Sequence, residues 1–462
     1  MLMTKDHVRD IFNRVRSFAS TPDVELLIGG GRSALTRFAN NTILQNVSEE
    51  DYSISVRVQF GGRTARASTN KLDPESLRRC VHAAESLARV QEEDPDLMPM
   101  YKADGTGTRV APSRHFAETA AVGPGERAEV VGRMVHVARR QNLNAAGVFA
   151  VSDHLEAIVN SHGVERWHEQ TSAETSITMQ AANSSGWQKA NAPDVRQLDP
   201  VKLAEIAAEK ARGSADPREI AAGKYTVILE PAAVLDIVGF MFWDFSGMAL
   251  LDQRSFLNNR IGKPLFGENI NIRDDAHHPL QAGAPFDGEG LERQTLELVS
   301  NGVVNQIAMS RSAARRIASS EFVAQVKNPH PTGHGFPLPN EMGEAPLNVV
   351  FEVGDGQPAQ SVEQMVAETE RGILVTRLWY IREVDPYEKI VTGMTRDGTF
   401  LVENGRVKHG VRNFRFNESL IHMLSNVESM GTPVRASGEE SFDMVVPAMK
   451  IREFNFTEVT KF

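Results

Sequence analysis

The strict alternation of apolar and polar residues in DYSISVRVQF, residues 51–60, constrains the fold more than any other feature of the sequence. A period of two is typical of a β-strand with one buried face, because successive side chains point to opposite sides of a sheet. Gly61 and Gly62 follow directly and predict a hairpin into the segment RTARAST. The chain must therefore form an antiparallel sheet and cover one face of it. The side chains expected on the buried face are Tyr52, Ile54, Val56, Val58 and Phe60.

Amphipathic helices are the expected cover for this sheet. HVRDIFNRVRSFA begins near the N-terminus, and PESLRRCVHAAESLARV follows the hairpin, with Asp73 as its cap. A second unit repeats this order, with a helix, strands in AGVFAVSD, LEAIVN, VERWHEQ and AETSITMQAAN, and a closing helix. We expect an N-terminal region over residues 1–220 with two α/β sub-units, about 1–110 and 111–220. The three glycines at 29–31 predict a turn between two strands.

The remaining residues, 221–462, are expected to form a second, β-rich domain. Asn301-Gly302 and Asn404-Gly405 each separate two strand-like segments, which is a strong hairpin signal. The predicted fold class is α+β, with helices packed on antiparallel sheets in the N-terminal half and a β-rich C-terminal half.

Charge and cysteine content exclude several functions. The net charge is −10, and no basic stripe occurs, so we expect no nucleic-acid partner. The longest apolar stretch is interrupted by Asp236 and is far shorter than a membrane span of about 20 residues. We therefore expect no membrane partner and a cytoplasmic location. The single cysteine, Cys80, excludes an internal disulfide and a multi-cysteine zinc site.

Several short motifs resemble, in the same order, those of the TldD/PmbA family. In the N-terminal half these are TRFANNTILQN and GGRTARAST. In the C-terminal half they are GKYTVILEPAAV, RSFLNNRIGKPLF, ETERGILVTRLWYI and TGMTRDGTFLVENGRVKHGV. The resemblance covers nearly the whole chain and implies a C-terminal domain of the TldD/PmbA type.

The resemblance also implies a zinc metallopeptidase assembly that acts on unfolded peptides. In its TldD-type subunit, the helix after the VILEP-like strand carries H-E-x-x-x-H, and a cysteine near the C-terminus completes the zinc site. The PmbA-type subunit, also called TldE, lacks these ligands and pairs with the TldD type.

In this chain the segment VLDIVGFMFWDFSG, residues 234–247, occupies the place of the catalytic helix but contains no histidine, cysteine or glutamate. The late segment RASGEESFDMVVPAMKIREFNF contains neither cysteine nor histidine. We therefore expect no catalytic residue and no metal ligand here, and zinc in a TldD-type partner subunit. The strong apolarity of residues 234–247 predicts a helix packed on all sides, with Trp243 well buried.

Other polar clusters leave alternatives open. Asn328, His330 and His334 lie in NPHPTGHGFP, whose prolines and glycines exclude a regular helix and favour a surface loop that shapes a peptide groove. Asp274, Asp275, His277 and His278 are expected to be solvated in a polar loop, and the pair Asp236 and Asp244 to have structural roles.

The leading hypothesis is thus a PmbA/TldE-like, non-metal subunit of a heteromeric zinc metallopeptidase. The alternatives are a self-sufficient, homo-oligomeric peptidase with an unconventional metal site, and a peptide- or protein-binding modulator without peptidase activity.

Overall fold

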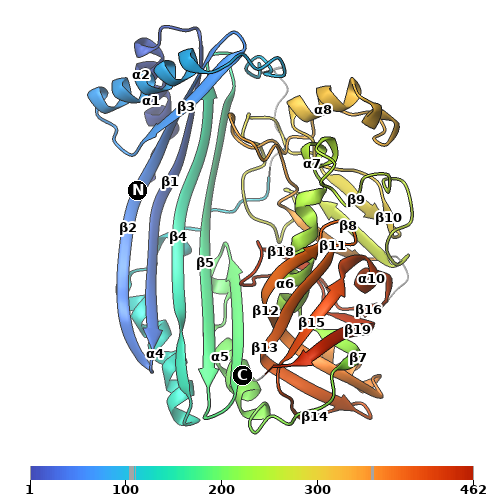
Figure 1. The fold of residues 1–462 in the computed structure, drawn as a ribbon. Coiled ribbons are helices and arrows are strands. Elements are labelled where there is room, and N and C mark those ends of the chain that lie inside the picture. The colour runs from blue at the N-terminus through green and yellow to red at the C-terminus, as the bar shows by residue number, and fades with distance from the viewer. Residues whose placement is uncertain (1, 104–108, 110, 355–357, 461–462) are drawn as a thin grey trace.

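The computed structural model describes residues 2–103, 109, 111–354 and 358–460. A tall, twisted sheet forms the N-terminal half, and a β-rich C-terminal half lies beside it (Figure 1). Helices and antiparallel sheets dominate the first half and strands the second, which confirms the predicted α+β class. None of the described helices is long and apolar enough to cross a bilayer.

The N-terminal sheet has the strand order β3-β2-β1-β4-β5-β6, and its neighbouring strands are antiparallel. Strands from both predicted sub-units thus join one sheet. The four short strands expected in the second unit are instead two long ones, because residues 144–160 and 165–180 each continue without a break. The strands are β1 (Asp23–Ala39), β2 (Thr42–Phe60), β3 (Arg63–Thr69), β4 (Asn144–Asn160), β5 (Glu165–Gln180) and β6 (Ser185–Ala192).

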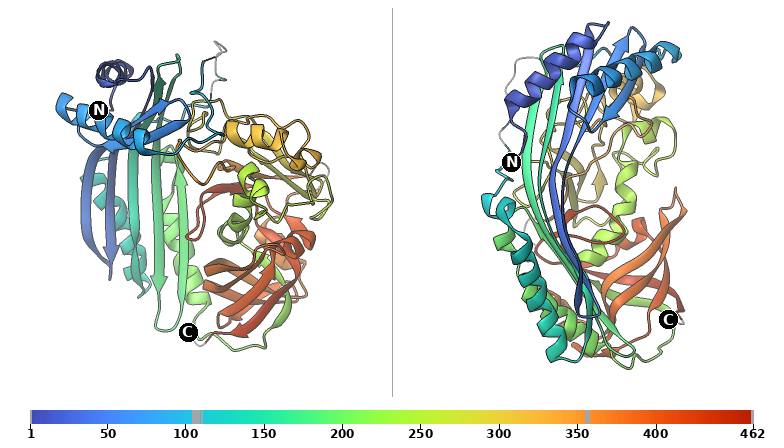
Figure 2. Two further views of the ribbon diagram at one scale, coloured as in Figure 1. Left: turned by 45° about the horizontal axis from the view of Figure 1, so that its top comes forward. Right: turned by 90° about the vertical axis from the view of Figure 1, so that its left-hand side faces the viewer.

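Helices cover one face of this sheet, and the C-terminal half approaches the other (Figure 2). On β1, Leu26 and Ile28 join the core beneath the first two helices, whereas Leu27 and Gly29 line a cavity shared with C-terminal loops. The period of two thus divides the sheet between a core and a functional surface. The helices are α1 (Lys5–Phe18), α2 (Pro74–Val90), α3 (Ala117–Ala121), α4 (Pro124–Arg140) and α5 (Pro200–Gly213), with a short 3-10 helix η1 (Val195–Gln197).

The turn predicted at the three glycines is wrong. Gly29, Gly30 and Gly31 lie inside β1, which pairs with β2 and β4 throughout this stretch. Gly30 and Gly31 have φ angles of +135° and +147°, and a Cβ on Gly30 would lie 2.2 Å from the carbonyl oxygen of Asp51. The glycines therefore permit a bend and a close strand contact in the middle of a long sheet.

The C-terminal half contains two further sheets. One has the order β10-β9-β8-β11-β18-β17. In the other, the path β12-β7-β19-β15-β13 closes on itself, because β12 pairs with both β7 and β13, while β14 and β16 pair at its margins. The strands are β7 (Gly223–Leu229), β8 (Ile270–Asp274), β9 (Leu296–Ser300), β10 (Val303–Val304), β11 (Val349–Val353), β12 (Arg371–Asp385), β13 (Ile390–Glu403), β14 (Arg406–Gly410), β15 (Phe414–Ser419), β16 (Val427–Met430), β17 (Val434–Ala436), β18 (Met444–Val446) and β19 (Met449–Val459).

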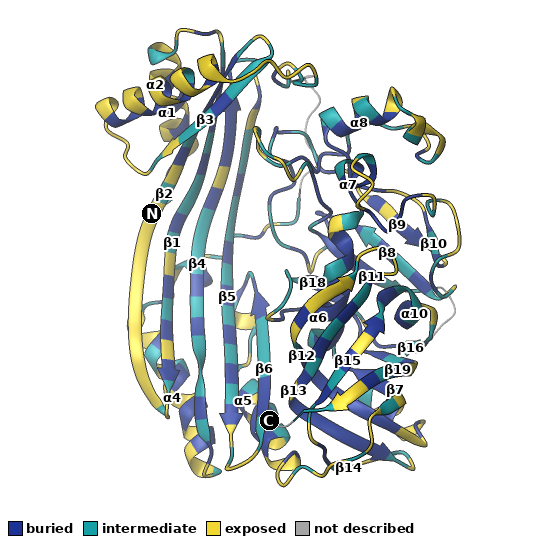
Figure 3. Ribbon diagram, viewed as in Figure 1, coloured by how far each residue is buried: buried dark blue, intermediate teal, exposed yellow. Residues whose placement is uncertain are grey.

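A single large hydrophobic core joins these two sheets to the helices between them. Both predicted Asn-Gly hairpins are confirmed, since Asn301-Gly302 joins β9 to β10 and Asn404-Gly405 joins β13 to β14, all with positive φ angles. Figure 3 shows the buried strands of this core and the exposed lower part of β2. The C-terminal helices are α6 (Pro231–Val238), η2 (Gly239–Asp244), α7 (Gly247–Leu251), α8 (Arg311–Ala318), η3 (Glu321–Ala324), α9 (Val362–Ala367) and α10 (Leu420–Ser425).

Candidate functional site

Helix α6 follows strand β7 directly and lies within the C-terminal core. Pro231 occupies its first turn, where the missing N–H costs nothing. Every side chain from Ala233 to Val238 is fully buried, against β12, β17 and β18 among other elements. A helix that is apolar on all sides is stable only in such a position.

Asp236 is the exception to this apolarity, and its carboxylate holds a second segment in place. Its Oδ1 accepts hydrogen bonds from the backbone N–H groups of Glu439 and Glu440, both at 3.0 Å. Burial raises the pKa of Asp236 to about 7, although these two N–H groups and the charge of Arg377 act in the opposite direction. The residue before Glu439 must be glycine, because a Cβ on Gly438 would lie 2.1 Å from Oδ1 of Asp236.

The segment 437–443 is fixed from its other side as well. The carboxylate of Glu440 accepts hydrogen bonds from the backbone N–H groups of Tyr380 (2.7 Å) and Ile381 (3.3 Å) at the irregular part of β12. Asp443 forms an ion pair with Arg435 at 3.0 Å. The two segments to which the resemblance assigns zinc ligands therefore meet, and their acidic groups are engaged in structural contacts.

The residues at this place do not fit a zinc ion. Asp236 accepts two backbone hydrogen bonds at Oδ1, and its buried Oδ2 has no partner among the described residues. Asp244 forms an ion pair with Lys389 at 2.5 Å, and the same ammonium pairs with Glu383 at 2.5 Å. Catalytic zinc sites need three protein ligands. Across the part of the chain that the structure describes, no group of three or more His, Cys, Asp or Glu side chains could hold a metal ion.

The prediction that Trp243 is well buried is wrong. Helix α6 ends at Val238 and continues as the 3-10 helix η2, so the apolar segment is not one helix. A 3-10 helix has fewer residues per turn than an α-helix, and Trp243 faces outward in it. Its side chain is 45% exposed, and its ring centroid lies 6.2 Å from that of Phe336. Phe242 and Phe245 occupy the core instead.

The three residues predicted to shape a peptide groove do not lie together on the surface. Asn328 and His330 are exposed. His334 is fully buried, and its two ring nitrogens are hydrogen-bonded to Asp274 (2.9 Å) and Thr332 (2.9 Å). The surface loop expected here is therefore wrong for His334, which pins the segment to β8. A role of Asn328 and His330 in a groove stays a prediction.

The loop after β8 is also less exposed than expected. Asp274 and Asp275 are buried, and so is His277. The Asp274 carboxylate accepts a hydrogen bond from the backbone N–H of Asn348 at 2.6 Å in addition to its contact with His334. Solvation is thus the wrong expectation for Asp274, Asp275 and His277, whereas His278 is half-buried.

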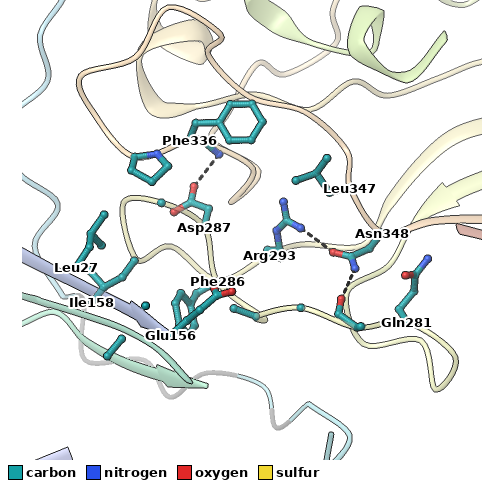
Figure 4. Close-up of a pocket in the computed structure, with 18 of the residues that line it drawn as sticks. Leu27, Glu156, Ile158, Gln281, Phe286, Asp287, Arg293, Phe336, Leu347 and Asn348 are labelled. Carbon is teal, nitrogen blue, oxygen red and sulfur yellow. Dashed lines mark hydrogen bonds between the residues drawn. The ribbon is translucent and has the colours of Figure 1, made fainter. Parts of the chain in front are cut away.

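A cavity of about 510 Å³ lies between the N-terminal sheet and the C-terminal loops (Figure 4). Strands β1 and β4 form one wall, and the loops around residues 281–293, 335–337 and 347–348 form the other. Arg435 of β17 also lines the cavity, as do Phe442 and Asp443 of the 437–443 segment. This volume is within the range of small-molecule and peptide-side-chain sites.

Asp287 fixes the loops that form the outer wall. Its carboxylate accepts hydrogen bonds from the backbone N–H groups of Glu289 (2.9 Å), Leu291 (2.9 Å) and Gly335 (3.0 Å). Burial and the neighbouring charge of Glu289 raise its pKa to about 7. Asp287 therefore joins the loop around residue 289 to the loop at Gly335, 48 positions away, and both line the cavity.

Glu156 and Arg293 bring opposite charges to the cavity without pairing. The Glu156 side chain is exposed, and within the described ranges its carboxylate forms neither a hydrogen bond nor an ion pair. Its surroundings raise its pKa through desolvation, while Arg293 lowers it. Arg293 is 9% exposed and donates from Nη1 to Asn348 Oδ1 at 2.6 Å, and its buried Nε has no partner among the described residues.

Sequence reasoning missed both of these charged residues. A signal was present at Glu156, because a carboxylate interrupts the apolar segment LEAIVN on a strand. Neither its face nor its neighbours could be read from that segment, since the opposing loops lie more than a hundred residues away.

Three sequence profiles of one family match the chain in order. They describe domain 1 (residues 24–88), the central domain (118–215) and the C-terminal domain (222–458) of PmbA/TldA metallopeptidases. The chain is 23% identical to the metalloprotease PmbA of Escherichia coli over 440 residues, which is 91% of this chain and 90% of that protein. It is 22% identical to a metalloprotease PmbA homologue of Haemophilus influenzae, over 93% of this chain and 94% of that protein. The crystal structure of TldE from Thermococcus kodakarensis has the same fold, with a TM-score of 0.84, 19% identity and coverage of 97% of this chain and 99% of that one.

Proposed function

The chain belongs to the PmbA/TldA metallopeptidase family, and on this premise we propose that it is the non-metal, PmbA/TldE-like subunit of a heteromeric zinc metallopeptidase. Its partner is a TldD-type homologue that holds zinc and supplies the catalytic glutamate. The substrate of the assembly is an unfolded peptide. This subunit completes the peptide-binding chamber and contributes no reacting group.

The contact between Asp236 and the 437–443 segment carries this proposal. The two segments that the family resemblance assigns to the zinc site are in contact, but here a buried carboxylate bonded to two backbone N–H groups joins them. The Oδ1 oxygen used in this way stabilises a loop, and the one carboxylate of Asp236 falls short of the three protein ligands that a catalytic zinc needs. The helix thus retains a structural role, and the chemistry is left to the partner.

The cavity between the sheet and the C-terminal loops supports a role in holding peptide. Its walls combine strand backbone with apolar side chains such as Leu27, Ile158 and Phe336. Because β1 and β4 are each paired on both edges, they offer a peptide side-chain contacts, and concave apolar sites of this size can accept the apolar side chains of a peptide. The alternative of a self-sufficient metal site at His330 and His334 is disfavoured, because His334 is enclosed and bonded to Asp274.

Co-purification tests the proposal. The tagged chain is expressed with an H-E-x-x-x-H-bearing homologue from the same organism, and the complex is isolated and its zinc measured. We expect a stable complex whose zinc is lost when the homologue's histidines are replaced and is retained in Asp236→Asn of this chain. A homologue that never associates with this chain would overturn the proposal.

A further inference from the structure

The cavity of about 510 Å³ is lined by two oppositely charged side chains that do not form an ion pair with each other. Glu156 projects from the C-terminal part of β4, and Arg293 from the loop opposite (Figure 4). They influence each other electrostatically, yet no ion pair joins them among the described residues. A cavity with separated charges suits a ligand that carries both charges itself, because desolvating either group alone is costly.

The other charged side chains at the cavity do not compete for this ligand. Arg435 is bonded to Asp443 at 3.0 Å and to the carbonyl of Leu280 at 3.2 Å. Asp287 accepts three backbone hydrogen bonds. Of the charged side chains in the described lining, Glu156 and Arg293 are therefore the two with neither an ion pair nor three backbone hydrogen bonds.

The rest of the lining is mostly apolar and aromatic. Leu27 and Ile158 come from the sheet, Phe286 from the loop above them, and Phe336 and Leu347 from the opposite wall. These side chains favour an apolar group between the two charges. Phe286, Ile158 and Leu27 also form a small hydrophobic cluster, which holds this side of the cavity in shape.

We propose that the cavity binds the zwitterionic backbone of a dipeptide or free amino acid with an apolar side chain, with Glu156 receiving the ammonium group and Arg293 the carboxylate. The ammonium then replaces water around a carboxylate that lacks a partner, and the ligand carboxylate accepts from the guanidinium, whose planar donors suit such a group. This inference rests on the proposed function, since peptide-bond hydrolysis creates one new ammonium group and one new carboxylate. The cavity is thus assigned to the short peptide and amino-acid products of that hydrolysis.

Calorimetric titration of the full chain tests the assignment with L-leucyl-L-phenylalanine as the probe. N-acetylation of the dipeptide removes the positive charge, and C-terminal amidation removes the negative charge. We expect each modified peptide to bind at least about tenfold more weakly than the free dipeptide, because each loses one charge-assisted hydrogen-bond contact.

Glu156→Gln should weaken binding of the free dipeptide about tenfold and leave binding of the acetylated form unchanged. Glu169→Gln is the matched control. Glu169 lies on the adjacent strand β5, but it pairs with Leu155 of the helix-covered core and so faces away from the cavity. This control should bind like the unmodified chain, and circular dichroism melting should show that both variants fold.

Equal affinity for the three peptides, or no binding of the free dipeptide by the folded chain, would overturn the inference. Such a result would leave the proposed function standing if the chain still associates with its zinc-bearing homologue. Loss of that association with dipeptide binding intact would overturn the proposed function alone.

Discussion

The carboxylate of Asp236 accepts a hydrogen bond from the backbone N–H of Glu440 at 3.0 Å, across 204 positions of the sequence. The neighbouring N–H of Glu439 donates to the same oxygen, and Glu440 in turn holds the irregular part of β12 through its own carboxylate. Helix α6, the 437–443 segment and strand β12 are thus joined around one buried acid.

Asp236→Ala should destabilise the chain by roughly 2–4 kcal/mol at neutral pH. The substitution leaves two part-buried N–H groups without their acceptor, and a buried group that loses its partner costs about 1–3 kcal/mol. Asp236→Asn should cost less, about 1 kcal/mol, because its amide oxygen still accepts. Urea unfolding followed by circular dichroism measures both values. An equal decrease in the free energy of unfolding for the two variants would show that the hydrogen bonds to the side-chain oxygen do not stabilise the fold.

The stability that depends on Asp236 should decrease as pH rises. Its pKa is about 7 in the folded chain and near 3.8 when exposed, so the folded state retains a proton that the unfolded state releases. This contribution is complete below about pH 4 and is lost as pH rises through about 7. The free energy of unfolding of the unmodified chain, minus that of Asp236→Asn, should therefore fall by a few kcal/mol between pH 4 and 8. A difference that is constant or rises with pH would contradict the raised pKa.

Trp243 and Phe242 are neighbours with opposite exposures, and their truncations should differ accordingly. Phe242→Ala should cost about 3–5 kcal/mol, because it creates a cavity in the main core. Trp243→Ala should cost less than about 1 kcal/mol, since nearly half of that side chain is exposed. Thermal unfolding of both variants is the measurement. A large loss for Trp243→Ala would mean that the residue is covered in solution, for example by a partner subunit.

His334 and His330 should also behave differently. His334→Ala removes the partner of a buried carboxylate, Asp274, and should cost about 3–5 kcal/mol. His330→Ala should change stability by less than about 0.5 kcal/mol, because the side chain is exposed. Chemical unfolding of the two variants distinguishes a structural histidine from a surface one. Equal, small effects would contradict the buried pair.

Local patterns predicted the elements well where one short-range cause decides the structure. The alternation at residues 51–60 gave strand β2, and the two Asn-Gly pairs gave hairpins with positive φ angles. The three glycines of β1 were misassigned because glycine serves both in turns and in close strand contacts. Only the neighbouring strands decide between these uses.

The site was less predictable, because its residues come together only in the tertiary structure. Asp274 and His334 are 60 positions apart, and nothing in either segment indicates that they pair and become buried. Trp243 was placed in the core from apolarity alone, whereas a change from α-helix to 3-10 helix turned it outward. Glu156 and Arg293 face one cavity from two halves of the chain, so no local pattern could have related them.

The division of labour between two subunits is the central claim, and a cleavage assay on an unfolded peptide tests it most directly. The purified chain, an H-E-x-x-x-H-bearing homologue from the same organism, and their mixture are each incubated with the peptide, with and without a chelator. We expect the chain alone to leave the peptide intact and the mixture to cleave it until the chelator is added. Chelator-sensitive cleavage by this chain in the verified absence of any partner would contradict the account.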